Sequence, residues 1–220
     1  MQDVLIIGAS GGIGRAIAER LERSGAHVTA LSRRQTGFDI TDPACVAQGL
    51  QGLGPFDAVL VASGALEVNG TEPEKSIKSI DAQAMAAQFA VNAIGPALVL
   101  KQAAQLLPKD RRSVFAVLSA RVGSIGDNRL GGWVSYRASK AAVNQIVHTS
   151  AIELARTHRQ SICVALHPGT VATPFTEKYL GRHPSVAPEH AAGNLLNVIN
   201  DLTPDKTGGF YDYSGAEVPW

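Results

Sequence analysis

The sequence predicts an α/β fold built on one doubly wound parallel sheet with helices on both faces. Short apolar runs alternate with segments of helical spacing along the chain. A glycine cluster directly follows the first apolar run, and no linker, internal repeat or change of composition divides the 220 residues. Strands that alternate with helices pair in parallel through right-handed crossovers. We therefore expect a single domain over residues 1–220.

The predicted strands are short apolar runs, a pattern typical of strands buried on both faces of a parallel sheet. The first covers residues 4–7 and ends in the glycine cluster. The later predicted strands cover residues 27–31, 58–62, 114–118 and 162–166.

The predicted helices have recognisable ends. The first covers 12–24 and stops at Gly25, a residue that commonly terminates helices. A short helix over 43–50 begins with Pro43 after a capping Asp42. Two long helices are predicted over 81–107 and 133–155.

Composition excludes several classes of protein. The chain is 45% hydrophobic, which is a globular level, and it is long enough to bury a core. The net charge of +1, with no run of five like charges, predicts no nucleic-acid partner. Cys45 and Cys163 are too isolated for a disulfide framework, and neither cysteines nor histidines have metal-ligand spacing. We see no apolar stretch of membrane-spanning length and no signal peptide, so we expect a cytoplasmic protein that binds no metal and no membrane.

The glycine cluster lies between the first predicted strand and the first predicted helix. Glycines there let the backbone turn tightly and approach a pyrophosphate, whose charge then faces the helix N-terminus. In this strand–turn–helix context the run predicts dinucleotide binding and a Rossmann-type sheet. The expected contacts are Gly8, Ser10, Gly11, Gly12, Ile13 and Gly14.

The choice of cofactor is indicated at the end of the second predicted strand. NAD enzymes usually place an acid there to hold the ribose hydroxyls. This chain has Ser32, Arg33 and Arg34, and no acid before Asp39. A guanidinium binds a 2′-phosphate that a carboxylate would repel, so the sequence favours NADP(H) over NAD(H). The alternative is that both arginines are merely solvated surface residues.

Tyr136 and Lys140 are four residues apart on a predicted helix, so they share a face. A phenol that works as a general acid–base near neutral pH needs its pKa lowered by about 3 units, or about 4 kcal/mol. A cation about 4 Å away at an effective dielectric near 20 supplies an interaction of that size. The spacing alone is common on exposed helices, but here it follows a dinucleotide motif.

Together these motifs resemble the short-chain dehydrogenase/reductase family over essentially the whole chain, and most closely its C-factor and sniffer-like carbonyl reductases. The resemblance includes residues 8–14, 39–42, Asp57, 92–95, 136–140 and 168–173. The branch is indicated by residues 123–125, 131–133 and the ending 209–220.

The resemblance implies a catalytic tetrad of Asn, Ser, Tyr and Lys. Tyr136 would exchange a proton with the substrate oxygen, and Lys140 would bind the nicotinamide ribose and lower the tyrosine pKa. Asn92 would hold a water that connects Lys140 to solvent, and Thr173 would bond the carboxamide. Further implied cofactor contacts are Asp39, Ile40, Ala62, Ser63, Gly64, Pro168, Gly169 and Val171.

Two departures from the family pattern stand out. The family usually has Asn-Asn-Ala-Gly where this chain has Val-Ala-Ser-Gly at 61–64. The register of the family's catalytic serine falls on Ala120. Ser119 is one residue early, so its side chain would face the other way in an extended strand. Ser124 lies on the following loop at nearly the usual separation from Tyr136, and we favour it weakly over Ser119.

These observations predict an NADP(H)-dependent oxidoreductase that reduces an aldehyde, ketone or quinone, or oxidises the matching alcohol. The alternative is a low-turnover dinucleotide-binding signalling or sensor protein on the same fold, which the displaced serine favours and the intact Tyr136, Lys140 and Asn92 oppose. A sugar-nucleotide epimerase also uses the Tyr–Lys pair, but the chain looks too short for its substrate domain.

Two further expectations concern substrate and assembly. The glycine- and proline-interrupted stretch 174–188 is predicted to be the substrate loop. The histidines at 148, 158, 167, 183 and 190 are interpreted as surface or core residues, and contact of His183 with substrate is the alternative. The two long helices carry more apolar and alanine residues than one buried stripe needs, which predicts a homodimer or homotetramer through these helices.

Overall fold

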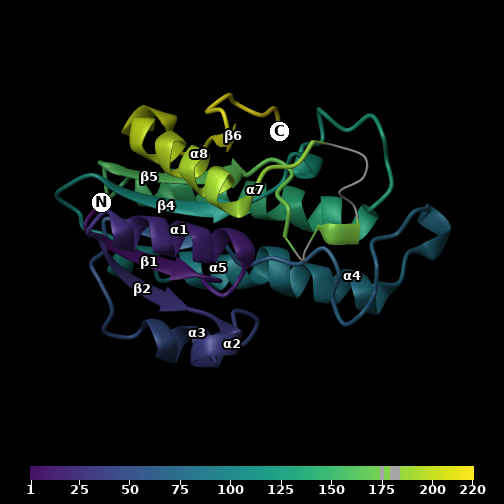
Figure 1. Cartoon of the computed structure of the whole chain (residues 1–220), viewed down its shortest axis with the longest axis horizontal. Helices are drawn as coiled ribbons and strands as arrows, with labels where there is room; N and C mark the ends of the chain where they lie inside the picture. The colour runs from purple at the N-terminus through teal and green to yellow at the C-terminus, as the bar shows by residue number, and fades with distance from the viewer. Residues whose placement is uncertain (174–175, 179–183) are drawn as a thin grey trace.

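The computed structural model describes residues 1–173, 176–178 and 184–220. They form an α/β structure around one sheet in the order β2-β1-β3-β4-β5-β6, with every neighbouring pair parallel. The strands are β1 (Asp3–Ile7), β2 (His27–Leu31), β3 (Ala58–Val61), β4 (Ser113–Leu118), β5 (Ser161–His167) and β6 (Phe210–Asp212). The doubly wound parallel fold predicted from the sequence is confirmed (Figure 1).

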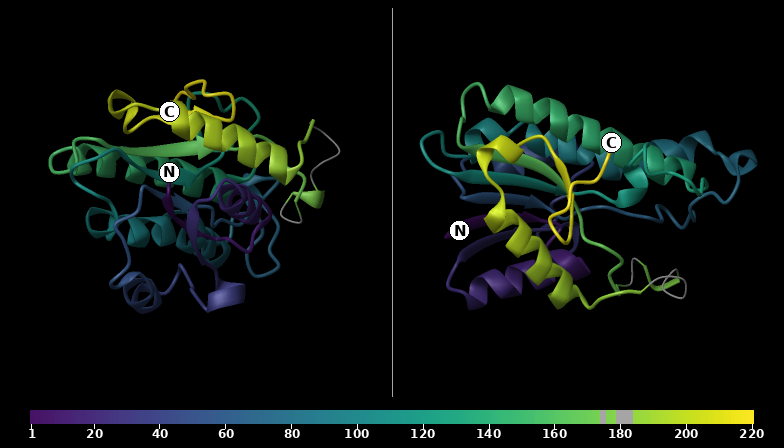
Figure 2. Two further views of the ribbon diagram at one scale, coloured as in Figure 1. Left: turned by 60° about the vertical axis from the view of Figure 1, so that its left-hand side comes forward. Right: turned by 90° about the horizontal axis from the view of Figure 1, so that it is seen from above.

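Helices cover both faces of the sheet. The helices are α1 (Gly12–Arg23), α2 (Arg33–Thr36), α3 (Pro43–Leu50), α4 (Ala82–Phe89), α5 (Gly95–Leu100), α6 (Ala103–Leu106), α7 (Val134–Leu154) and α8 (Pro188–Asp201). Shorter helical segments are η1 (Ile77–Ser79), η2 (Ala90–Ile94), η3 (Arg121–Gly123) and η5 (Pro204–Lys206). Figure 2 shows α1 and α8 on one side of the sheet and α7 on the other.

The strands are buried on both faces because successive side chains enter different cores. Leu5 and Ile7 of β1 pack with residues of α3, α5 and α7. Val4 and Ile6 pack with residues of α1 and α8. An apolar strand of this kind has no polar face, which explains why its sequence is continuously hydrophobic.

The long helix predicted over 81–107 is wrong as a single element. The chain instead forms α4, the π-helical segment η2, α5 and α6 in succession. Pro96 explains the π-helical segment, because it has no N–H to donate to the preceding turn and its ring crowds the carbonyl four residues earlier. The helical run continues past Pro96 and ends at Leu100. Helices α2 and α8 and strand β6 also lie outside the elements that the sequence analysis predicted.

The segment Ala82–Leu100 also corrects the expectation about apolar stretches. In the described part of the chain it is the one helical run that is long and apolar enough to cross a membrane, with a mean hydropathy of 1.3. A helix packed in a protein core passes the same test. Here η2 and α5 pack on α7, and 39% of the apolar window is buried.

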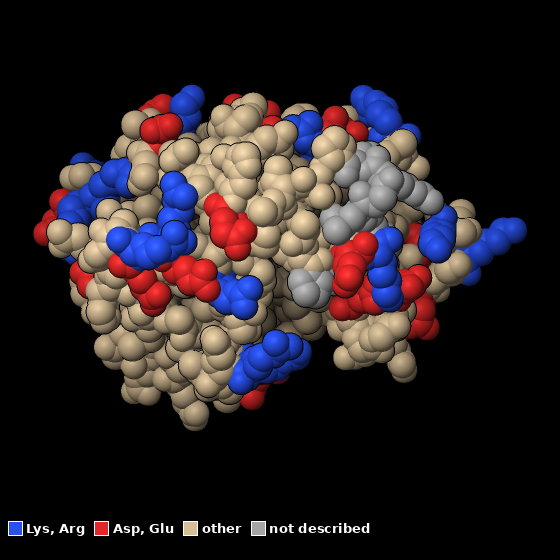
Figure 3. Space-filling model, in the orientation of Figure 1, with Lys and Arg blue, Asp and Glu red and all other residues tan. Residues whose placement is uncertain are grey.

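Charged side chains of both signs are scattered over the face of the molecule in Figure 3, and a broad area between them is uncharged. No field of one sign dominates this face.

Candidate active site

The main cavity lies at the carboxyl ends of the strands and has a volume of about 980 Å³. In a doubly wound sheet this edge is where ligands bind, beside the point at which the strand order reverses. Here the reversal falls between β1 and β3. The lining comes from the turn after β1, the segments after β3, β4 and β5, and the first turns of α7.

The turn after β1 is shaped by backbone contacts that only glycine permits. Gly8 has a φ of 91°, and its N–H donates to Leu31 O of the neighbouring strand at 2.8 Å. A Cβ on Gly14 would lie 2.4 Å from Gly8 O, so the helix could not come this close to the turn with any side chain there. Gly11 is the N-cap of α1 and offers no side chain to the first turn.

The first amides of α1 are therefore left for a ligand, and Gly11, Gly12, Ile13 and Gly14 line the cavity. A helix N-terminus with free N–H groups attracts phosphate. Gly8 and Ser10 belong to the same turn but are not among the described lining residues.

The predicted 2′-phosphate residues lie beyond the end of β2, outside the main cavity lining. The Ser32 hydroxyl caps α2 by accepting from Gln35 N at 3.3 Å, which places exposed Arg33 and Arg34 in its first turn. Asp39 accepts hydrogen bonds from Thr41 N and Oγ1, and these bonds, with a smaller contribution from the Arg33 charge, lower the pKa of its carboxyl. Ile40 is buried against Gly95.

Tyr136 and Lys140 lie side by side in the first turns of α7, and both line the cavity. Lys140 Nζ is 5.8 Å from the centroid of the Tyr136 ring and donates to Leu118 O at 2.9 Å. Burial raises the pKa of the Tyr136 phenol and lowers the pKa of the Lys140 ammonium to about 8. The direction of the tyrosine shift is opposite to the one expected from Lys140, because burial of the phenol disfavours the phenolate.

Asn92 holds the segment after β3 close to Lys140 of α7. Its Oδ1 accepts from Ala65 N at 2.9 Å, and its Nδ2 donates to Ala65 O at 2.8 Å and to Gln88 Oε1 at 2.6 Å. A Cβ on Gly64 would lie 3.2 Å from Asn92 Oδ1 and 3.3 Å from Lys140 Nζ. Asn92 is part of the π-helical segment, a distortion that often marks functional sites.

The two candidate serines lie in different places. Ser119 lines the cavity beside Ala120, and its hydroxyl donates to Asn144 Oδ1 at 2.6 Å. Ser124 is buried and accepts from Asp127 N at 3.0 Å, and it is not among the described lining residues. The geometry favours Ser119 over the serine that the sequence analysis favoured.

The segment after β5 lines the cavity as the family resemblance implied. Pro168, Gly169, Val171 and Thr173 all contribute, as do Ala62, Ser63 and Gly64 from the segment after β3. Among the described residues no group of three or more histidine, cysteine or acidic side chains could hold a metal.

Sequence analysis missed His167, for which a surface or core role was expected. His167 lines the cavity, and its Nδ1 is buried without a hydrogen-bond partner in the described part of the chain. Burial, assisted by the charge of Arg121 and opposed by that of Asp212, lowers its pKa to about 4. The signal was its position directly before the 168–173 motif.

Trp133 both lines the cavity and packs edge-on against the Tyr136 ring, with centroids 6.2 Å apart. It has a φ of 53°, after Gly131 and Gly132 at 63° and 69°. A bulky residue held in the left-handed region is an outlier, and such outliers cluster at functional sites.

The predicted substrate loop is described only in part, and His183 lies outside the described residues. Thr176 and Lys178 line the cavity. Lys178 Nζ forms ion pairs with Glu67 Oε2 at 3.0 Å and Glu72 Oε1 at 3.2 Å. These pairs join the loop to the segment after β3.

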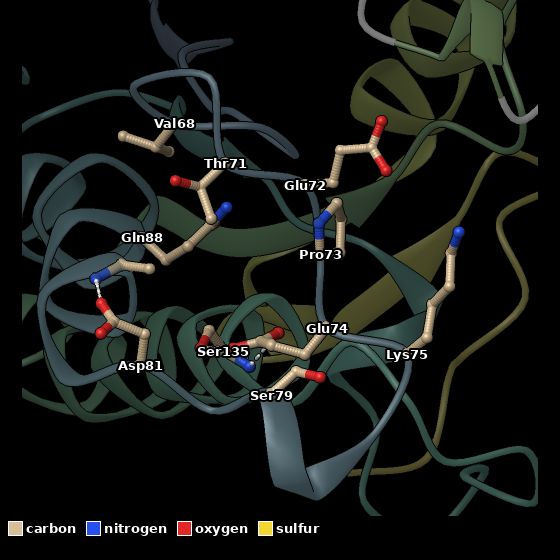
Figure 4. Close-up of a pocket in the computed structure, with 11 residues that line it drawn as sticks. Val68, Thr71, Glu72, Pro73, Glu74, Lys75, Ser79, Asp81, Gln88 and Ser135 are labelled. Carbon is tan, nitrogen blue, oxygen red and sulfur yellow. Dashed lines mark hydrogen bonds between the residues drawn. The ribbon is translucent and has the colours of Figure 1, made fainter.

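Sequence analysis also missed Glu74, which lines a second cavity of about 330 Å³ (Figure 4). Its carboxylate accepts hydrogen bonds from Ser135 N and Oγ at the start of α7. Glu74 O also accepts from Trp133 N at 2.6 Å. These contacts fix the segment around Glu74 to the first turn of α7.

Among protein families, one described as short chain dehydrogenase matches residues 2–41 and 36–182 of the chain. A 1-hydroxy-2-glutathionyl-2-methyl-3-butene dehydrogenase from Rhodococcus sp. (strain AD45) is 31% identical over 237 residues, which cover 100% of both chains. The C-signal protein of Myxococcus xanthus is 34% identical over 148 residues, 66% of this chain and 84% of that protein.

Solved structures share the fold over the whole chain. A short-chain dehydrogenase/reductase from Burkholderia multivorans with bound NADP has a TM-score of 0.80 at 25% identity, covering 100% of this chain and 99% of that one. A carbonyl reductase from Pseudomonas aeruginosa PAO1 has a TM-score of 0.80 at 25% identity, with 100% of both chains covered. The carbonyl reductase Sniffer of D. melanogaster, at 22% identity and full coverage of both chains, has a TM-score of 0.76.

Proposed function

Since the chain belongs to the short-chain dehydrogenase/reductase family, we propose that it is an NADP(H)-dependent enzyme that reduces the carbonyl of an aldehyde, ketone or quinone, or oxidises the matching alcohol. Membership of the family makes the chain an oxidoreductase of CH–OH or C=O groups. The observation that carries the finer proposal is that the Tyr136–Lys140 pair and the uncapped N-terminus of α1 line one cavity.

The residues present fit a nicotinamide dinucleotide. The free amides of α1 would hold its pyrophosphate, and the segment 168–173 would hold its carboxamide end. When bound, the nicotinamide supplies or accepts the hydride at the substrate carbon. Arg33 and Arg34 would bind the 2′-phosphate, and the similar Burkholderia structure contains NADP.

Tyr136 serves as the acid in the reducing direction. Its burial keeps the phenol protonated, and only that form donates a proton to a carbonyl oxygen. Lys140, whose pKa is about 8, can return a proton to the phenolate, and Asn92 would hold the water that replaces the proton on Lys140.

The test is the Tyr136→Phe variant, assayed by NADPH oxidation against aldehydes, ketones and quinones. General acid–base catalysis contributes about 10²–10⁴-fold, so we expect kcat to fall by at least about 100-fold. The Kd for NADPH should not change, because the ring and its packing remain. The matched control is Tyr211→Phe, whose hydroxyl bonds Lys206 O and lines no part of the cavity. Wild-type kcat in Tyr136→Phe would refute the mechanism.

A serine is proposed to polarise the substrate carbonyl, and its identity is tested by comparing Ser119→Ala with Ser124→Ala. A flip of the Asn144 amide would make Nδ2, which has no partner within the described ranges, a donor to Ser119 and free the hydroxyl proton for the cavity. We expect Ser119→Ala to lose about 100-fold in kcat, the usual size for an oxyanion donor. A larger loss in Ser124→Ala would return the role to the loop serine, and two near-neutral variants would assign it to water or backbone.

A second candidate function is a low-turnover dinucleotide-binding signalling or sensor protein. The observation that favours it is Ala120 at the family's serine position, with the neighbouring Ser119 hydroxyl engaged by Asn144. Tight NADPH binding without oxidation of NADPH by any of the carbonyl compounds would support this candidate over the enzyme.

We also propose a cytoplasmic homodimer or homotetramer. Ile94 on η2 and Ile152 on α7 are 51% and 53% exposed, on the two long helical runs that carry surplus apolar residues. Light scattering at micromolar concentration that returns the monomer mass of 23.1 kDa would contradict self-association.

A further inference from the structure

We propose that the substrate carries a carboxylate, which Lys75 and Arg137 bind at the substrate end of the main cavity. This inference rests on the proposed function and names the class of carbonyl compound that the site accepts.

The first observation is the charge of the cavity lining. Among the described lining residues there is no aspartate or glutamate, whereas the cations are Lys75, Arg137, Lys140 and Lys178. Two of these cations are already engaged. Lys140 is buried beside Tyr136, and Lys178 is paired with two glutamates outside the lining. Lys75 and Arg137 have no ion pair within the described ranges.

Arg137 is held next to the reacting group. It directly follows Tyr136 on α7, and its Nε donates to Gly132 O at 3.0 Å while Nη1 donates to Val122 O at 3.3 Å. These carbonyls orient the guanidinium without neutralising it. Arg137 is partly buried, so its charge has lost part of its solvation, and this burial lowers the pKa of its guanidinium. A partly desolvated cation without a carboxylate partner is stabilised by an anionic ligand.

Lys75 is brought to the same rim by its neighbour. Glu74 fixes residues 72–75 to α7 through Ser135 and Trp133, one turn or less from Arg137. Figure 4 shows the Glu74 carboxylate against Ser135, with the Lys75 side chain pointing away from that pair. The carboxylate adjacent to Lys75 is thereby engaged by the start of α7. Lys75 itself is exposed and lines both cavities, and it has no ion pair with Glu72 or Asp81, the other acidic residues of the second cavity.

The rest of this end of the cavity is apolar. Leu66, Val122, Leu130 and Trp133 contribute to the lining near Tyr136. A fitting substrate therefore combines an apolar body with a carbonyl that reaches Tyr136 and a carboxylate that reaches the two cations.

The experiment compares 4-carboxybenzaldehyde with its neutral methyl ester, methyl 4-formylbenzoate, as substrates of the full chain with NADPH. The variants are Lys75→Met and Arg137→Met, and the matched control is Lys78→Met, a lysine of η1 outside both cavities. Charge-assisted contacts are worth about 1.5–3 kcal/mol, so wild-type kcat/KM should favour the acid by about 10-fold or more. Each variant should lower the ratio of kcat/KM for the acid to kcat/KM for the ester about 10-fold, through KM for the acid.

Two outcomes would overturn the proposal. One is equal wild-type kcat/KM for acid and ester; the other is an equal loss for both substrates in the variants, since a structural role of Arg137 would not distinguish them. The Kd for NADPH, measured in every variant, must stay constant, because a change would assign the cations to the cofactor phosphates instead.

A binding measurement distinguishes failure of the proposed enzymatic function from failure of the proposed carboxylate site. Calorimetry of terephthalate with NADP⁺-loaded protein needs no turnover. A Kd about 10-fold weaker in Arg137→Met than in wild type supports the anion site even if no aldehyde is reduced. Equal Kd values overturn the anion site even if aldehydes are reduced.

Discussion

The two walls of the main cavity are held in place by different means. The wall at which we propose that the cofactor binds, formed by the turn 8–14 and by residues 167–173 and called the cofactor wall, is positioned by strand ends and by close backbone approaches at glycine, such as Gly14 against Gly8. The substrate wall, residues 66–75 and 121–133, also has close backbone approaches at Gly123 and Gly126, but it is held in addition by side chains that reach across the fold. The Glu74 carboxylate accepts hydrogen bonds from the start of α7, and Arg137 donates hydrogen bonds to loop carbonyls.

This difference decides what each wall tolerates. A backbone approach cannot relax by changing a rotamer, so a single added methyl group moves the chain itself. A side-chain contact can be weakened by degrees, and its loss leaves the strands in place. We therefore expect substitutions in the cofactor wall to be severe and those in the substrate wall to be graded.

The largest effect is expected for Gly14→Ala. Its Cβ would lie 2.4 Å from Gly8 O and 3.0 Å from Gly8 C, both backbone atoms, so α1 must move away from the turn. Overpacking costs about 1–3 kcal/mol, and we expect a loss near the upper value, measured by urea unfolding. NADPH affinity should fall at least about 10-fold, because the displaced amides no longer converge on the pyrophosphate.

The matched control is Gly193→Ala, which also adds a methyl group inside a helix. A Cβ at Gly193 in α8 would meet the Arg20 guanidinium at 3.4 Å, an ordinary contact. Since glycine is about 0.5–1 kcal/mol worse than alanine within a helix, this variant should be slightly more stable than wild type. Equal stability of the two variants would show that the close backbone approach at Gly14 does not make the cofactor wall more sensitive to substitution.

A smaller effect is expected for Arg33→Ala, which tests whether the cofactor side also depends on a side chain. Removing a charge-assisted contact costs about 1.5–3 kcal/mol, so NADPH binding should weaken about 10- to 100-fold while NADH binding is unchanged. Fluorescence titration measures both, with Arg23→Ala at the far end of α1 as the control. Equal losses for the two cofactors would make Arg33 structural, and equal wild-type affinity for both would refute the preference for NADP(H).

The same distinction explains how much could be predicted from the sequence. The cofactor wall could be predicted from the sequence because local patterns encode it: the apolar run of β1, the glycines that follow and the start of α1. The pairing of Tyr136 with Lys140 could be predicted because residues four apart on a helix share a face. Pro96 carried a signal that the predicted helix is distorted, and the π-helical segment η2 lies directly before the turn that contains it.

The substrate wall could not be predicted from the sequence in this way. Glu74 and Ser135 are 61 residues apart, and neither belongs to a pattern that announces the contact. Ser124 has nearly the family's spacing from Tyr136, yet distance along the chain did not reveal that its hydroxyl faces Asp127 N. The orphaned Nδ1 of His167 likewise depends on the packing of several elements around it.

The smallest effect is expected for Glu74→Gln, which weakens the substrate wall without changing its shape. Trp133, the N-cap of α7, provides no side-chain cap, so the Glu74 carboxylate supplies both the acceptor and the negative charge at this helix start. Glutamine retains one acceptor and loses the charge. Capping and dipole interactions are worth about 1 kcal/mol, which lowers Tm by about 2–4 °C in a chain of this size.

The kinetic signature of Glu74→Gln separates the walls more sharply than its stability does. A loosened 72–75 segment moves Lys75 and the start of α7, so KM for the carbonyl substrate should rise about 3-fold, or about 0.7 kcal/mol. The Kd for NADPH should stay within error, because no residue of the cofactor wall contacts Glu74 in the described structure. Glu22→Gln, at an exposed position of α1, controls for the change of charge. If the affinity for NADPH falls while KM rises, the first turn of α7 transmits the perturbation through Tyr136 and Lys140. The two walls would then form one cooperative unit.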